Sequence, residues 1–100
     1  MSQSTITISV TITSHAFQRA KERLGFDRTA TQRMSMKAYI AGKKHSQCKG
    51  QLKKYIDALY LQYHAANNIR IHGEAIYLFA SNRLITIYTL PNQYKTIAKK

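Results

Sequence analysis

The fold is decided by residues 69–91, which read IRIHGEAIYLFASNRLITIYTLP. Three runs rich in β-branched and aromatic residues, 69–72, 75–79 and 84–90, are separated by Gly73-Glu74 and by Ser81-Asn82. A leading glycine suits a two-residue hairpin turn, and a proline at position 91 ends the last strand. Consecutive strands joined by such short turns must be antiparallel neighbours, so this stretch predicts a three-stranded meander.

The residues before the meander predict one strand and three helices. Residues 5–13 alternate isoleucine or valine with threonine or serine, which is typical of a strand with one buried face. Apolar side chains recur at helical spacing in residues 15–24, 29–41 and 52–63. Ser14 is the expected N-cap of the first helix and Gly25 its end, and Thr29 is the expected start of the second. We expect a loop at Lys43 and Lys44.

The order of these elements predicts an α+β fold. An N-terminal strand and three helices precede the meander, so we expect two layers, with the helices on one face of about four strands. The sequence leaves open whether the first strand joins an edge of the meander or pairs elsewhere. Residues 1–91 form the single predicted domain, and residues 92–100 carry little to bury, which predicts a flexible basic tail.

The charge balance indicates a polyanionic partner. Sixteen Lys and Arg face four acids, giving a net charge of +12, and the acids are Glu22, Asp27, Asp57 and Glu74. At least a dozen cations must therefore face solvent or an external polyanion, and nucleic acid is the commonest such partner. A single cysteine, scattered histidines, no signal peptide and no membrane-spanning run predict a cytoplasmic protein without a metal or cofactor site and without a membrane partner.

Alternation along the meander gathers cations and rings on one predicted sheet face. Arg70 and His72 lie opposite the isoleucines of the first run, and Tyr77, Phe79 and Tyr88 are set apart in the same way from their aliphatic neighbours. Cations hold phosphate and rings stack on unpaired bases, so this composition favours RNA over DNA, with the ribosome as one setting. The predicted nucleic-acid-binding residues are Arg19, Arg23, Arg33, Lys37, Lys49, Lys53, Lys54, Arg70 and Arg83.

The sequence disfavours most enzyme classes. It has no paired carboxylates for a metal-dependent nuclease, no glycine-rich phosphate loop and no serine nucleophile motif. Metal-free RNA cleavage remains, because it needs a base, an acid and a cation acting on the 2′-OH of the RNA. The candidate catalytic residues are His72, His15, Arg70 and Tyr88: the histidines as base and acid, Arg70 with Arg19 on phosphate, and Tyr88 stacking or donating a proton.

Two resemblances bear on function. Helices followed by a meander, a basic surface and no metal-ligand spacing resemble the RelE-like ribonuclease toxins, which cleave RNA without metal through varied sets of Arg, Lys, His and Tyr. The second is similarity to small uncharacterised proteins of bacterial and prophage genomes, and it is carried by His15-Ala16 with Arg19, Glu22-Arg23, Lys49-Gly50 with Leu52, residues 67–71, and Leu84-Ile85-Thr86 with Leu90-Pro91.

Three hypotheses follow. The first is an RNA- or ribosome-binding module that uses the basic surface and the sheet aromatics. The second is a metal-independent endoribonuclease of the RelE-like kind. The third is a phage-encoded inhibitor of a bacterial nucleoprotein complex, against which the positive charge counts, because an acidic nucleic-acid mimic would suit that role better. The RNA-binding module ranks first because binding requires fewer correctly placed residues than catalysis does.

Overall fold

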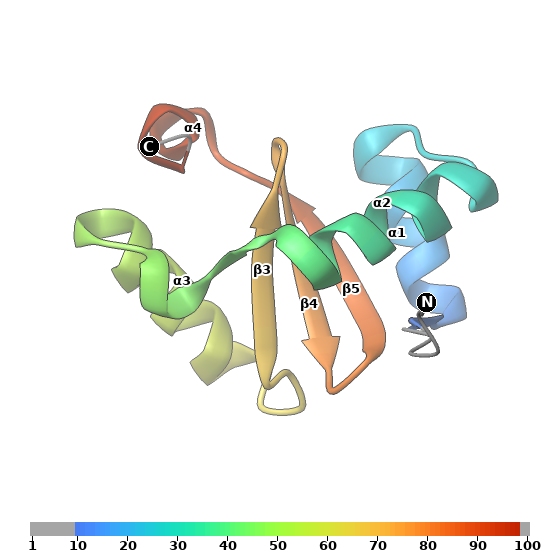
Figure 1. Ribbon diagram of the computed structural model, residues 1–100, viewed down its shortest axis with the longest axis horizontal. Helices are drawn as coiled ribbons and strands as arrows, with labels where there is room; N and C mark the ends of the chain where they lie inside the picture. Colours follow the sequence, from blue (N-terminus) through green and yellow to red (C-terminus); the bar gives the residue numbers. More distant parts are fainter. Residues whose placement is uncertain (1–9, 99–100) are drawn as a thin grey trace, which may run out of the picture.

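A computed structural model describes residues 10–98, which fold as an α+β protein (Figure 1). Along this part of the chain the elements are β1 (Thr11–Ile12), α1 (Ser14–Leu24), α2 (Arg28–Ala41), β2 (Lys43–Lys44), the 3-10 helix η1 (His45–Gln47), α3 (Gly50–Gln62), β3 (Asn68–His72), β4 (Ala75–Ala80), β5 (Arg83–Thr89) and α4 (Asn92–Ala98). The predicted class is confirmed, and β3, β4 and β5 form the predicted antiparallel meander.

The sheet has the strand order β1-β5-β4-β3-β2 within the described residues. The first strand joins the β5 edge of the meander and runs parallel to β5, with Thr11 opposite Arg83. Residues 5–9 of the predicted strand lie outside the described residues. At the other edge, Lys43 and Lys44 form a short strand beside β3 instead of the predicted loop.

Side-chain caps fix where the first two helices begin. The hydroxyl of Thr13, one residue before the predicted cap, accepts a hydrogen bond from Ala16 N at 3.1 Å and also donates to the Leu84 carbonyl oxygen, so it ties the start of α1 to β5. A carboxylate oxygen of Asp27 accepts from Ala30 N at 2.7 Å, which starts α2 before the predicted Thr29. Gly25 ends α1 in the left-handed region, as predicted.

Helices cover both faces of the sheet, and this corrects the predicted two-layer arrangement. One core joins α1 and α2 to the sheet through Ala16, Ala20, Ala38, Ala75, Tyr77, Phe79, Leu84 and Ile87. The other joins α3 to the opposite face through residues that include Leu52, Ile56, Leu59, Ile69, Ile71, Ile76 and Leu78. In Figure 1, α1 and α2 lie on the right and across the front of the sheet, and α3 lies on the left. β4 therefore alternates between two buried faces.

The segment after Pro91 differs from the predicted tail. Residues Asn92–Ala98 form α4, and the ring of Tyr94 packs against the core beneath α3, 5.1 Å between centroids from the ring of Tyr55. Lys95 also contacts Glu74 at 3.3 Å. The aromatic side chain is the apolar group that the prediction overlooked in this segment. Residues 99–100 of the predicted tail lie outside the described residues.

Gly42 lies where the end of α2 comes close to β3. It is buried, and a Cβ added there would stand 2.4 Å from the Ala38 carbonyl oxygen and 2.9 Å from the Cβ of Arg70. We expect Gly42→Ala to lower the free energy of unfolding by about 1–3 kcal/mol, because the crossing must shift to admit the methyl group. Urea denaturation measures this. Ala41→Ser, at the exposed neighbouring position, should stay within about 0.5 kcal/mol of wild type. Equal stability of the two variants would contradict the claim that the close contact at Gly42 leaves no room for a methyl group.

Candidate nucleic-acid interface

The predicted exposed sheet face does not exist in the structure. Tyr77 is 1% exposed and Phe79 is fully buried, because α1 and α2 pack over them. Arg70 lies opposite Tyr77 across the β3–β4 ladder, and His72 lies opposite Ala75, so both belong to the covered face. Tyr88 lies opposite Ile76, on the α3 face. The sheet therefore separates Arg70 and His72 from Tyr88.

Arg70 is occupied by the protein itself. Its Nε donates to the side-chain oxygen of Asn68 at 2.9 Å, and a terminal nitrogen donates to the Gly42 carbonyl oxygen at 3.0 Å. The bond to Gly42 ties β3 to the residue that follows α2, and the bond to Asn68 holds the guanidinium in place within β3. The buried hydroxyl of Tyr77, which burial alone holds at a raised pKa of about 12, has no hydrogen-bond partner among the described residues. Both side chains are better explained as parts of the packing than as binding groups.

The outer edge of β5 brings other predicted residues together. Beyond Leu84 no strand pairs with this edge within residues 10–98, since the chain turns from β1 into α1. Arg23 reaches from α1 to the edge, where a terminal nitrogen donates to the Ile87 carbonyl oxygen at 2.8 Å. Its guanidinium carbon lies 4.3 Å from the ring centroid of Tyr88 on the other side of the sheet. Arg23 thus wraps around the sheet edge and joins its two faces.

Two further polar groups continue along α1 from Arg23. His15, Arg19 and Arg23 are spaced four residues apart, so they form one stripe on the helix. Arg19 Nε donates to Nε2 of His15 at 3.4 Å, and a terminal nitrogen of Arg19 contacts Glu22 at 2.7 Å. The hydrogen bond from Arg19 is the main reason that the pKa of the Glu22 carboxyl lies below its usual value.

Two tyrosines, Tyr88 and Tyr63, extend this stripe beyond Arg23 at the end of α1. The hydroxyl of Tyr63, from the residue that ends α3, is hydrogen-bonded to the hydroxyl of Tyr88, and their ring centroids lie 5.9 Å apart. Both rings are partly exposed. We call His15, Arg19, Arg23, Tyr63 and Tyr88 the edge surface. Among the predicted site residues, it brings together His15, Tyr88, Arg19 and Arg23.

The remaining predicted cations lie elsewhere. Arg33 and Lys37 are exposed on α2, and Arg83 is exposed at the start of β5. Lys49, Lys53 and Lys54 are exposed at the start of α3, on the opposite side of the sheet from α2. These six cations are thus distributed over α2, α3 and the start of β5, and none of them lies on α1 with the stripe of His15, Arg19 and Arg23. His72 lies half-buried at the end of β3.

A histidine–aspartate pair is the arrangement that sequence reasoning missed. Nε2 of His45, in η1, lies 2.5 Å from a carboxylate oxygen of Asp57 on α3, and Lys53 lies 3.6 Å from the other oxygen. The ring of Tyr60 meets the His45 ring edge-on at 5.3 Å. The hydrogen bond with His45 is the main cause of a lowered pKa at Asp57. No sequence motif predicts this pair, because His45 and Asp57 are twelve positions apart and lie in different helices.

Comparisons with known proteins found no match for this chain. No family model matches the chain, no curated protein is detectably similar in sequence, and no solved structure matches its fold. No helix within residues 10–98 has the length and apolar character needed to cross a membrane. In the same part of the chain, no three His, Cys, Asp or Glu side chains gather closely enough to hold a metal ion.

The lowered pKa of Asp57 predicts how stability depends on pH. Folding favours the ionised carboxylate, so its contribution is complete above the ordinary aspartate pKa of about 3.9 and is lost as pH falls through the folded-state value. We expect Asp57→Asn to be less stable than wild type near neutral pH, with the difference shrinking as the pH falls below the ordinary aspartate pKa and the folded-state carboxylate takes up its proton. Urea denaturation across pH tests this. In a His45→Gln control, NMR titration should find the pKa of Asp57 closer to its usual value; an unchanged pKa would contradict the assigned cause.

Proposed function

We propose that the protein binds RNA through the edge surface, with single-stranded segments as its target. The observation that carries the proposal is the stacking of the Arg23 guanidinium on Tyr88 at an unpaired strand edge, beside Arg19 and His15. Cations and partly exposed rings are thus placed within one strip of surface. Cations bind the phosphates of a nucleic acid, and exposed rings stack on its unpaired bases. A single strand of RNA offers both groups.

The charge balance supports the same proposal. Glu22 contacts Arg19, Asp57 contacts His45 and Lys53, Glu74 contacts Lys95, and Asp27 caps α2. All four carboxylates of the chain therefore have a role within the fold, and four carboxylates cannot neutralise sixteen Lys and Arg side chains. The excess positive potential attracts a polyanion from a distance, and the edge surface supplies short-range contacts.

Arg19→Gln tests the edge surface, because Arg19, unlike Arg23, donates no hydrogen bond to the backbone of another element among the bonds described above. We expect wild type to bind a fluorescent single-stranded RNA at low salt, with a log–log salt slope of about −2 to −3 if three or four phosphates are contacted. Arg19→Gln should weaken binding and make the slope shallower by about 0.7. Fluorescence anisotropy over a salt series measures both quantities.

Two matched variants sharpen this test. Arg33→Gln removes the same charge from the exposed side of α2, so it should change affinity less than Arg19→Gln does. Glu22→Gln removes the carboxylate that competes for Arg19, and we expect it to strengthen binding. Equal losses for Arg19→Gln and Arg33→Gln would contradict a localised site and leave only a diffuse charge effect.

A metal-independent endoribonuclease is the second candidate, and the contact between His15 and Arg19 is what favours it. Arg19 Nε donates to the one lone pair of His15 Nε2, and once Arg19 turns to a phosphate this lone pair is free to take the proton of the 2′-OH, as a general base requires. Water would supply the proton to the departing 5′-oxygen. Arg19 would then hold the phosphate next to the attacked 2′-OH. Eight residues of helix, about 12 Å of rise, separate His15 from Arg23 and hence from Tyr88. Tyr88 would therefore contact a neighbouring nucleotide and not the one being cleaved.

Cleavage separates the two candidates. Purified protein is incubated with RNA in EDTA, and products are examined for 2′,3′-cyclic phosphate ends. If the protein is a nuclease, His15→Ala should abolish these products with little effect on RNA affinity, whereas His64→Ala, an exposed histidine beyond the end of α3, should leave cleavage intact. Binding by wild type without cyclic phosphate products would exclude the nuclease and leave the binding module.

A further inference from the structure

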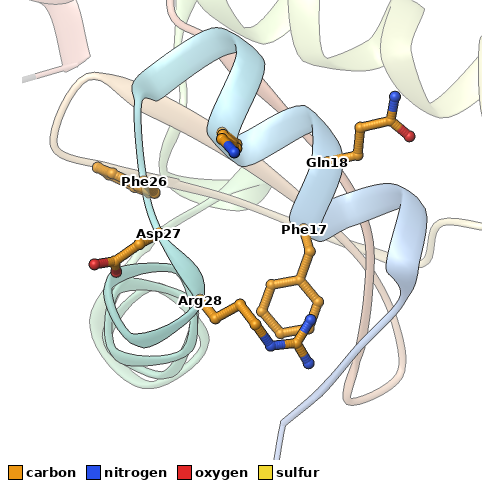
Figure 2. Close-up of a pocket in the computed structure, with 6 residues that line it drawn as sticks. Phe17, Gln18, Phe26, Asp27 and Arg28 are labelled. Atoms are coloured by element: carbon orange, nitrogen blue, oxygen red, sulfur yellow. The ribbon is translucent and has the colours of Figure 1, made fainter.

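A pocket opens between α1 and the start of α2. It has a volume of about 340 Å³ and is lined by Phe17, Gln18, Lys21, Phe26, Asp27 and Arg28 (Figure 2). That volume lies at the lower end of the range of about 300–1,000 Å³ found for small-molecule sites. Two phenylalanine rings make a wall that can accept one flat ring by stacking. The pocket is therefore suited to a planar ligand of modest size.

A guanidinium group extends the aromatic wall. The guanidinium carbon of Arg28 lies 4.0 Å from the centroid of the Phe17 ring, and Figure 2 shows the two side chains against one another. Arg28 is exposed, so its remaining N–H groups can reach a phosphate while its plane stays on the ring. Lys21, also exposed, adds a second cation to the lining. An apolar wall with cations beside it matches a nucleotide, which joins a flat base to a phosphate.

We propose that this pocket takes one base of the bound RNA strand, with Lys21 and Arg28 on the adjoining phosphates. The inference rests on the proposed RNA binding and adds to it a site where a base leaves the strand and stacks against protein. The apolar lining of the pocket decides which part of the nucleotide enters. Its surface is almost entirely apolar, so the uncharged base occupies the interior and the charged phosphate stays outside.

The pocket and the edge surface lie on the two sides of α1 and are connected across its exposed face. Gln18, which lines the pocket, donates to one oxygen of Glu22 at 3.2 Å, and Arg19 of the edge surface donates to the other at 2.7 Å. A helix with its side chains is about 10–12 Å wide, so a short stretch of extended strand can cross it. One strand can therefore contact Arg19 and place a nearby base in the pocket.

Phe17→Ala tests the pocket with two strands of equal length, one normal RNA and one abasic strand that keeps the ribose-phosphate chain. Phe17 is only partly buried and lies outside both cores, so the variant should fold. We expect its affinity for normal RNA to fall about tenfold, within the range for loss of one stacked base, and its affinity for the abasic strand to match that of wild type. Leu61→Ala, at an exposed apolar position on α3, is the matched control and should change neither affinity.

Fluorescence of 2-aminopurine in the strand gives a direct reading, because this base is quenched when it stacks. Wild type should quench it and Phe17→Ala should not. If Phe17→Ala binds normal RNA as wild type does while Arg19→Gln binds it weakly, the pocket proposal is overturned and RNA binding stands. If wild type binds neither strand at low salt, both the proposed RNA binding and the pocket proposal are overturned. A hydrophobic dye that RNA cannot displace from the pocket would assign it to an apolar ligand.

Discussion

Burial of β4 on both faces is the constraint on which the rest of the structure depends. Ala75, Tyr77 and Phe79 enter the core beneath α1 and α2, while Ile76 and Leu78 enter the core beneath α3. A central strand of this kind requires a helical layer on each side, because its apolar side chains would otherwise face water. The meander therefore cannot present a free face to a ligand, and the sheet can offer only its edges and the helices that cover it.

The same packing leaves the outer edge of β5 to be closed by a side chain. β5 is the last strand of the meander. α1 packs close against it because Ala16 and Ala20 are small and are buried beside Leu84 and Ile87. The close approach lets Arg23 reach the edge of β5 and satisfy the Ile87 carbonyl oxygen there. An exposed strand edge is otherwise open to pairing with another chain, and a charged side chain laid across it prevents this. Arg23 thus protects this edge of the sheet, and its guanidinium also stacks on Tyr88.

Most of the local structure could be predicted from the sequence, because periodicity is a local property. The meander, the three long helices and the stop at Gly25 follow from spacing and turn residues. The second helical layer was missed, although the unbroken apolar run from Ala75 to Phe79 was the signal for a strand buried on both sides. The edge surface could not be predicted as a unit, since Arg23 and Ile87 are 64 residues apart and only the packing of α1 along β5 brings them together.

The charge of the protein connects these observations. A net charge of +12 on a chain of one hundred residues weakens the compact state through self-repulsion, and the four carboxylates are already engaged in ion pairs or a helix cap. A polyanion that binds only the folded chain relieves part of this repulsion, so binding and stability are thermodynamically coupled. The cations spread over α2 and α3 contribute to that long-range attraction from any direction. Under the proposed function, the groups that would hold an RNA strand in one position are instead those with fixed neighbours, and at the edge of β5 the guanidinium of Arg23 is fixed by a backbone carbonyl and by an aromatic ring.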